Sequence, residues 1–330
     1  MTTPLLSVRD LRVSFAAPQS KKWPWSPAKR VNAVNGVSFD LPAGKTLGVV
    51  GESGCGKSTL VRAIAGLYPP TSGDVTFDGK PVDYTNRRET NALRSRMQMI
   101  FQDPIASLNP RMNIREIVTE PLRVFRPDMT AQAQKEAVRA MLDRVGIAER
   151  NFNRYPHEFS GGQCQRIGIA RALVTEPDIL LCDEPVSALD VSIQAQVINI
   201  LKELQKDMGL TLVFVAHDLG VVRHISDEIL VMYMGGVMEH APAADLVAAP
   251  QHPYTKALFS AVPVPDPKVT TTPEVLDGDL PSPLDLPEGC LFQSRCPRRM
   301  SRCATTRPAL RHVGQSKVAC LLYEPEPAAI

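Results

Sequence analysis

The 330-residue sequence lacks long apolar runs and has almost no net charge. No window approaches the roughly 18 consecutive apolar residues of a membrane-spanning helix, and the first residues lack the basic stretch and apolar core of a secretion signal. The 37 basic residues nearly balance the 35 acidic ones, which argues against an extended nucleic-acid surface. We therefore expect a protein that is neither secreted nor membrane-spanning and that binds no nucleic acid.

Tryptophan is also scarce. Both copies, Trp23 and Trp25, fall in a loop predicted at residues 16–30, where they suit either stacking on an adenine or a proline-spaced surface loop.

The length suggests about two domains, and the 44% apolar content is enough for a core. Because seven cysteines occur without a secretion signal, a cysteine cluster points to a metal site before it points to disulfides.

The most informative stretch is residues 51–59. It matches the phosphate-loop pattern G-x-x-x-x-G-K-[S/T] at every fixed position and reads Gly51, Glu52, Ser53, Gly54, Cys55, Gly56, Lys57, Ser58 and Thr59. The glycines let backbone N–H groups close around phosphate oxygens, while Lys57 adds positive charge and Ser58 a hydroxyl ligand for Mg²⁺. A strand predicted at residues 46–50 and a helix at 58–67 complete the pattern of a nucleotide triphosphatase.

Polar residues also follow two later apolar strands. Asp183 and Glu184 end the strand predicted at residues 179–184, and His217 follows the strand predicted at 211–216. Beside a phosphate loop, an aspartate at a strand tip suits the Mg²⁺ shell. Glu184 is then placed to polarise an attacking water as general base, an effect of roughly 10²- to 10⁴-fold. Alone, such a carboxylate pair would fit a solvated turn equally well.

The rest of the sequence before about residue 241 shows both strand and helix patterns. Residues 5–15 suit an edge strand with a partner at 34–41, and a turn at Asp78-Gly79 indicates a further pair of strands. Residues 87–173 are expected to form a helical insert, in which Thr130 caps one helix. A later long helix is predicted to begin at Asp190 or Ser192 and to end at Gly209.

The composition changes beyond about residue 241, where 14 of the 29 prolines fall in the last 89 residues. A loop-rich extension without a periodic helix is expected there. Four of its residues are cysteines with spacers of 5, 6 and 16 residues, namely Cys290, Cys296, Cys303 and Cys320. These spacers are wider than in paired structural zinc ligands, which favours an iron–sulfur cluster, while zinc and unligated thiols stay open. Cys55 and Cys182 are predicted to be small buried residues.

These features converge on one family. Residues 159–166, Phe-Ser-Gly-Gly-Gln-Cys-Gln-Arg, precede Asp183-Glu184, Ser187-Ala188-Leu189-Asp190 and His217, and this order resembles the ATP-binding subunits of ABC transporters. The resemblance implies an α/β phosphate-loop NTPase core of ABC type, with an antiparallel β edge and a helical subdomain, over residues 1–240. A loop-rich extension would cover 241–330. ATP and Mg²⁺ are the ligands it implies.

The resemblance also implies roles for individual residues. Lys57 and Ser58 would hold phosphates and Mg²⁺ together with Asp183, and Gln102 would sense metal and water. Glu184 would be the general base and His217 the switch histidine on the γ-phosphate. The residues that would clamp ATP bound on an opposing subunit are Ser160, Gly161, Gly162 and Gln163, at a helix start that exposes N–H groups to an anion.

Three further positions complete this assignment. Asp190 would belong to the dimer-contact loop. Cys164 departs from the family, which usually carries Arg, Gln or Lys there, although the flanking residues are intact. Trp25 is the candidate for the aromatic residue that stacks on adenine.

A narrower resemblance covers nearly the whole chain. Residues 33–39, 101–111, 184–192 and 252–255 are similar to the dipeptide and oligopeptide importer branch, and most to the second of its two ATPase subunits. It implies a partner ATPase subunit, two membrane permease subunits, an extracytoplasmic peptide-binding protein and a peripheral place on the cytoplasmic face of the inner membrane. It also implies a four-iron four-sulfur cluster on the four cysteines. The cargo, and whether the ATPase pair is a homodimer or a heterodimer, stay open.

Two rival functions differ in class. An ATPase of this branch recruited to a soluble enzyme complex, such as carbon-phosphorus lyase, would act as scaffold or regulator, but the extension and its His252-Pro253-Tyr254 motif favour the transporter. A nucleic-acid repair or ribosome-associated ATPase fits poorly with the near-neutral charge and the single ATPase unit.

Overall fold

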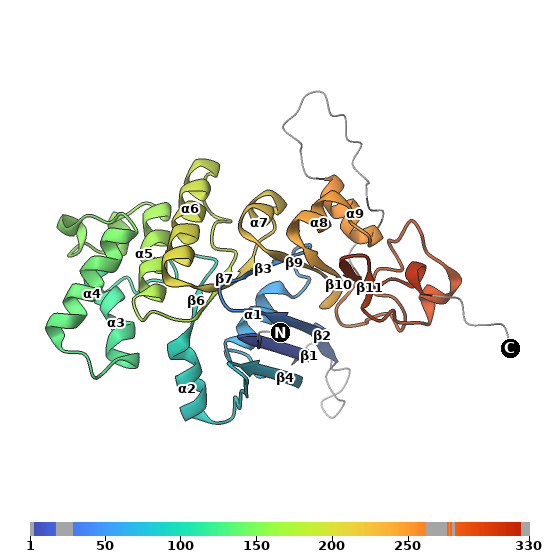
Figure 1. Ribbon diagram of the computed structural model, residues 1–330, viewed down its shortest axis with the longest axis horizontal. Helices are drawn as coiled ribbons and strands as arrows, with labels where there is room; N and C mark the ends of the chain where they lie inside the picture. Colours follow the sequence, from blue (N-terminus) through green and yellow to red (C-terminus); the bar gives the residue numbers. More distant parts are fainter. Residues whose placement is uncertain (1–2, 18–28, 262–275, 277, 279–280, 325–330) are drawn as a thin grey trace.

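The computed structural model describes residues 3–17, 29–261, 276, 278 and 281–324 (Figure 1). Within these residues, an antiparallel sheet has the order β2-β1-β4-β5, with bounds Leu6–Ala16 for β1, Arg30–Leu41 for β2, Ser72–Phe77 for β4 and Lys80–Pro81 for β5. The turn at Asp78-Gly79 joins β4 to β5, as predicted. The prediction of an edge position for β1 is wrong, because β4 pairs with its free side and that long-range pairing leaves no mark on the alternation of β1.

The larger sheet of the described residues has the order β11-β12-β10-β9-β3-β8-β7-β6. Its strands are β3 (Thr46–Val50), β6 (Met97–Ile100), β7 (Ile179–Asp183), β8 (Thr211–Val215), β9 (Glu228–Tyr233), β10 (Gly236–Pro242), β11 (Arg311–Val313) and β12 (Ser316–Val318). The strands from β9 to β6 run parallel. Every residue of β3, β7 and β8 is buried, which explains why these strands read as continuous apolar runs.

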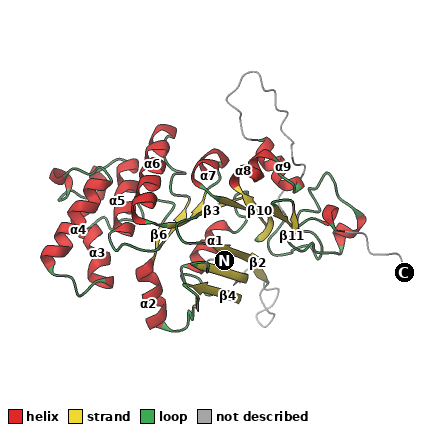
Figure 2. Ribbon diagram, viewed as in Figure 1, coloured by secondary structure: helices red, strands yellow, loops and turns green. Residues whose placement is uncertain are grey.

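Helices cover both faces of this sheet (Figure 2). They are α1 (Lys57–Ile64), α2 (Arg87–Arg96), α3 (Ile114–Phe125), α4 (Ala131–Arg144), α5 (Gly161–Leu173), α6 (Val191–Met208), α7 (Leu219–Ile225), α8 (Ala243–Ala248) and α9 (Pro253–Ser260), with short 3-10 turns at Glu149–Asn151, Pro156–Glu158, Ser301–Ala304 and Leu321–Tyr323. Helix α1 contacts strands of both sheets and fills the space between them (Figure 1). Helices α3, α4 and α5 pack together at the far end from the extension.

The predicted start of α4 and both predicted ends of α6 are confirmed, whereas α1 ends at Ile64 and not at residue 67. The Thr130 side chain accepts a hydrogen bond from the Ala133 N–H at the start of α4. Asp190 precedes α6, which ends at Gly209 in the left-handed conformation that favours glycine. The range 87–173 is not helical throughout, because β6 lies within it and joins the main sheet beside β7.

The extension continues the main sheet. Strand β12 pairs antiparallel with β10, with Glu239 opposite Val318. The expectation that the extension has no periodic helix is wrong, since α8 and α9 both lie beyond residue 241. Helix α9 forms because the ring of His252 accepts a hydrogen bond from the Tyr254 N–H and Pro253 occupies the first helical position. Among the described residues, none of the helices combines the length and apolar character required to cross a bilayer.

Candidate functional site

The phosphate loop connects β3 to α1, as predicted. Gly51 and Gly56 both have positive φ, 151° and 103°. A Cβ atom on Gly51 would lie 2.2 Å from the Met232 carbonyl oxygen, and one on Gly56 would lie 2.0 Å from the Ala33 carbonyl oxygen. Only glycine therefore fits these two positions, where the loop presses against its neighbours.

Lys57 is held inside this loop. Its side chain lies almost fully buried, with the residue 4% exposed. Its Nζ donates hydrogen bonds to the carbonyl oxygens of Gly51 at 2.8 Å and Glu52 at 3.1 Å. The ammonium group is thus fixed within the curve of the loop, where the backbone N–H groups of such a loop would gather phosphate oxygens.

A cavity of about 380 Å³ lies over the loop, a size typical of small-molecule sites. It is lined by Phe15, Val31, Ala33, Ser53, Gly54, Gly56, Lys57, Ser58, Thr59, Gln102, Glu184 and Pro283. The apolar wall of this cavity consists of Phe15, Val31, Ala33 and Pro283, and the loop residues together with Gln102 and Glu184 supply its polar and charged groups. Trp25 lies outside the described residues, and the aromatic ring that lines the cavity belongs to Phe15. Sequence reasoning missed Phe15, although its place near the end of the first strand, directly before the loop, was the available signal.

The parallel strands bring three predicted catalytic residues together. Gln102, Glu184 and His217 follow the ends of β6, β7 and β8, which are adjacent in the sheet. The Gln102 Nε2 donates a hydrogen bond to the Glu184 Oε2 at 3.1 Å. The same oxygen lies 3.6 Å from the His217 Nδ1. Residues that end neighbouring parallel strands meet at one edge of the sheet, which is why three distant sequence positions converge.

Glu184 is held in a strained backbone conformation. Its φ is 48°, in the left-handed region, a conformation that costs of order 1–3 kcal/mol for a residue other than glycine. Its N–H donates to the Val215 carbonyl oxygen at 3.0 Å, and its own carbonyl oxygen accepts from the Ser187 N–H at 3.3 Å. Its side chain is 15% exposed. The backbone bonds thus hold the carboxylate at the cavity wall.

Asp183 is fully buried beside this group. Its Oδ2 lies 2.9 Å from the Arg62 Nη2, but neither carboxylate oxygen has a hydrogen-bond partner of good geometry among the described residues. Carboxylate and hydroxyl oxygens are the ligands that Mg²⁺ prefers. Asp183 is not among the residues that line the cavity, but the acceptor capacity left on it and the hydroxyl group of Ser58 in the cavity wall have the chemistry that suits this ion.

The segment 160–163 lies elsewhere. Ser160 and Gln163 form a capping box at the start of α5, in which each side chain accepts a hydrogen bond from the other residue's N–H. Of the described residues that line the phosphate-loop cavity, none comes from this segment. Cys164 is fully buried and its Sγ lies 3.5 Å from the Pro156 carbonyl oxygen, so the atypical residue faces the protein interior.

The four cysteines of the extension are close enough to influence one another. Burial, together with the other three thiols, raises the pKa of Cys290 to about 11. However, the described part of the chain contains no group of three or more His, Cys, Asp or Glu side chains arranged to hold a metal ion. The described residues therefore do not support the expected iron–sulfur cluster or zinc site. Within these loops the Cys290 N–H donates a hydrogen bond to the Cys303 carbonyl oxygen at 2.9 Å, and the Met300 N–H donates to the Cys303 Sγ at 3.4 Å. Cys55 and Cys182 are small buried residues, as predicted.

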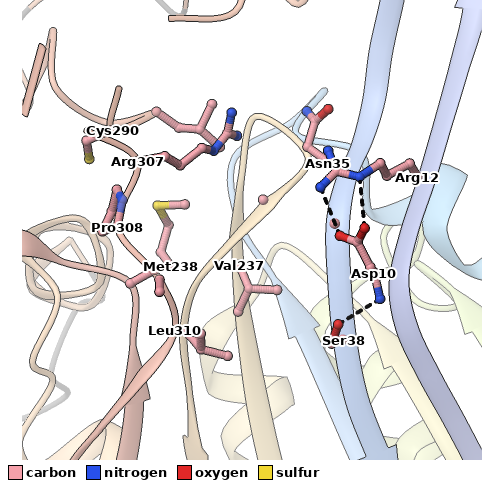
Figure 3. A pocket seen from close by; sticks show the side chains of 15 residues that line it. Asp10, Arg12, Asn35, Ser38, Val237, Met238, Cys290, Arg307, Pro308 and Leu310 are labelled. Atoms are coloured by element: carbon pink, nitrogen blue, oxygen red, sulfur yellow. Dashed lines mark hydrogen bonds and ion pairs between the residues drawn. The ribbon is translucent and has the colours of Figure 1, made fainter. Parts of the chain in front are cut away.

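A second cavity of about 320 Å³ lies where the extension meets the antiparallel sheet (Figure 3). Arg12 and Asp10 form an ion pair of 2.9 Å on its β1 wall. Arg307 reaches in from the opposite wall (Figure 3), where burial and the charge of Arg12 lower its pKa. Asp10 thus offsets part of the positive charge that the two arginines bring to this cavity.

Family models define the class of this chain. The model described as ABC transporter matches residues 34–187, and the model described as oligopeptide/dipeptide transporter, C-terminal region, matches residues 238–303. The solved structure of cbiO1 from Clostridium perfringens superimposes with a TM-score of 0.64 at 28% identity, covering 75% of this chain and 92% of that one. The ATP-binding cassette MJ0796, in a dimer bound to ADP and Pi, also gives 0.64 at 28% identity, covering 72% and 98%.

Individual relatives narrow this class. The chain is 55% identical to the oligopeptide transport ATP-binding protein OppF of Escherichia coli over 97% of each chain. It is 50% identical to the putative oligopeptide transport ATP-binding protein YkfD of Bacillus subtilis, covering 97% of this chain and 96% of the relative. The chain therefore belongs to the ATP-binding proteins of ABC transporters, with the C-terminal region of the oligopeptide/dipeptide branch, and its fold is the phosphate-loop α/β fold predicted for them.

Proposed function

We propose that this chain is the ATP-hydrolysing subunit of an ABC importer for dipeptides or oligopeptides. The observation that carries the proposal is the single cavity that unites the phosphate loop with Gln102 and Glu184, in a chain that also matches the oligopeptide/dipeptide transporter C-terminal region. We assign residues 1–240 to the ATPase part and 241–330 to the extension.

ATP would bind with its phosphates in the loop and its base on the apolar wall. The ammonium group of Lys57 is already fixed there and would pair with the β and γ phosphates. Ser58, Gln102 and Asp183 would hold Mg²⁺, which supplies charge neutralisation on the phosphates. Phe15 replaces Trp25 as our candidate for stacking on adenine, because its ring lines the cavity.

Hydrolysis would use the group around Glu184. Its carboxylate would polarise the attacking water as general base. Gln102 donates to this carboxylate and would keep it oriented, and His217, 3.6 Å from the same oxygen, would contact the γ-phosphate. The strained backbone of Glu184 would help to keep the carboxylate pointing at the water.

A second ATPase subunit would complete the site. The segment 160–163 does not line the chain's own cavity within the described residues, yet it presents a helix N-terminus suited to an anion. We propose that it clamps ATP bound on an opposing subunit, with Asp190 at the contact. The relation to a dimeric cassette supports this arrangement, and we expect the opposing subunit to be a second, related ATPase.

One of the two membrane permease subunits would dock beside Gln102. An apolar groove of about 360 Å³ there is lined by Leu67, Phe101, Val124, Phe125 and others, and Leu67 and Val124 are 44% and 63% exposed. Phe101 directly precedes Gln102, so a permease segment in this groove would affect the residue that orients Glu184. The chain would then lie on the cytoplasmic face of the membrane, with a peptide-binding protein on the other side.

Co-purification tests this proposal against the soluble-complex rival. The tagged chain, extracted from membranes in mild detergent, should retain two integral membrane proteins and show ATPase activity that a peptide-loaded binding protein stimulates. Recovery in a soluble enzyme complex without membrane partners would contradict the proposal. The match of residues 238–303 to a transporter region favours the first outcome.

A further inference from the structure

Two residues of the extension contact the phosphate loop directly. The Arg295 Nη1 donates hydrogen bonds to both carboxylate oxygens of Glu52, at 3.1 and 2.8 Å. The Tyr254 Oη accepts a hydrogen bond from the Glu52 N–H at 2.9 Å. Glu52 is the second residue of the loop and occupies a variable position of the pattern, so the pattern itself gives no reason for these contacts.

These two contacts and Lys57 together engage Glu52 at three points. Its side chain pairs with Arg295, its N–H with Tyr254, and its carbonyl oxygen accepts the hydrogen bond from the Lys57 Nζ at 3.1 Å. A movement of Glu52 would therefore move the ammonium group that faces the phosphates. The extension supplies two of these three contacts.

The contacts are well shielded from water. The side chains of Arg295 and Glu52 are 10% and 23% exposed, so solvent screens their attraction less than that of a surface pair. Tyr254 is fully buried, and its ring packs against those of Tyr233 and Phe292, with centroids 4.8 and 5.3 Å away. The aromatic rings thus fix the direction of the Tyr254 hydroxyl group.

The position of Tyr254 depends in turn on the main sheet. The buried carboxylate of Glu239, in β10, accepts hydrogen bonds from the N–H groups of Gln251 and His252. His252 caps the helix that carries Tyr254. Strand β12 pairs with β10 and ties the far end of the extension to the same strand. The contact with the loop therefore comes from a firmly anchored element.

We propose that Arg295 and Tyr254 are positioning residues for nucleotide binding, which hold the phosphate loop and Lys57 through Glu52. The C-terminal extension is then part of the ATP site and not only an appendage of it. Pro283 supports this view, because it also lines the cavity over the loop and its carbonyl oxygen accepts a hydrogen bond from the Asn32 N–H at 3.2 Å. This inference rests on the proposed ATPase function.

The test measures the dissociation constant of Mg-ATP and the melting temperature of the full-length chain. We expect Arg295→Gln and Tyr254→Phe each to weaken ATP binding roughly tenfold, since the first removes a shielded ion pair with two hydrogen bonds and the second a shielded hydrogen bond. Tyr254→Phe keeps the ring packing, and Arg295→Lys should recover part of the affinity. The matched control is Arg311→Gln, which breaks an ion pair of 3.3 Å with Glu324 within the extension and should leave ATP binding unchanged.

A double-mutant cycle separates positioning from general destabilisation. Because Arg295 acts through Glu52, the double variant Glu52→Gln with Arg295→Gln should bind ATP no more weakly than the weaker single variant. Additive losses, or unchanged ATP binding in Tyr254→Phe, would overturn the inference, as would losses that only follow the melting temperature. If the wild-type chain binds no Mg-ATP, the proposed ATPase function itself fails.

Discussion

The phosphate loop and the four cysteines of the extension are both sequence patterns that indicate a ligand, but their structures differ. The loop is contiguous, and a buried strand and a helix fix its two ends. The cysteines are spread from residue 290 to 320, through loops, 3-10 turns and two short strands, and they do not form a metal site among the described residues. A contiguous motif encodes its own geometry, whereas a dispersed one depends on the fold around it.

The largest expected effect concerns the phosphate-loop side of this comparison. Glu184→Gln should bind ATP with affinity near that of the wild type but lose roughly 10²- to 10⁴-fold in turnover, because the amide cannot act as a base. Lys57→Ala should weaken both binding and turnover, since it removes charge from the loop. Steady-state ATPase rates and Mg-ATP binding on the same samples check both variants. Unchanged hydrolysis in Glu184→Gln would remove the general-base assignment.

A smaller effect is expected at the apolar wall of the cavity. Phe15→Ala should weaken ATP binding by roughly 5- to 100-fold, as expected for a lost base-stacking contact, and Phe15→Trp should retain most of the affinity. Trp25→Ala is the matched comparison, measured with the same fluorescent ATP analogue. An equal loss in Trp25→Ala with none in Phe15→Ala would return the stacking role to Trp25.

The smallest effect concerns the extension and is a dependence on pH. Burial lowers the pKa of His252 to about 3, from a usual value of 6.5. Below pH 6.5 the unfolded chain takes up a proton that the folded chain refuses, so folding stability should fall as the pH drops toward 3. From pH 7 to 5.5 this corresponds to a fall of roughly 2 °C in melting temperature.

Substitution isolates this contribution. His252→Asn keeps a side chain that caps helices well but does not titrate, so its melting temperature should fall less between pH 7 and 5.5 than that of the wild type. His312→Asn, at an exposed position of the extension, should leave the pH dependence unchanged. Identical pH profiles for the wild type and His252→Asn would show that His252 does not stay neutral in the folded protein.

Much of the candidate site could be predicted from the sequence for a physical reason. The strand, loop and helix around Lys57 are adjacent in the chain, and Glu184 and His217 follow predicted strands whose parallel arrangement makes their ends meet. These features need only local pattern and one rule of topology. Gln102 is predicted only through the family resemblance, because the strand before it lies in a range expected to be helical.

The missed features all depend on long-range packing. The pairing of β1 with β4, the aromatic contribution of Phe15 and the contacts of Tyr254 and Arg295 with Glu52 join segments far apart in the chain. From the sequence, the His252-Pro253-Tyr254 motif is informative only as a family resemblance. Its physical role is to start a helix that carries the Tyr254 hydroxyl group to the phosphate loop. This role can be recognised only from the fold.

The most direct test of the account is peptide uptake by the complete transporter in lipid vesicles. A labelled oligopeptide is supplied with the binding protein on one side of the membrane and Mg-ATP on the side of this subunit. We expect uptake that requires ATP and this chain, and that Glu184→Gln abolishes while the complex stays assembled. Uptake that continues with Glu184→Gln, or an assembled wild-type complex that hydrolyses ATP without moving peptide, would contradict the proposed function.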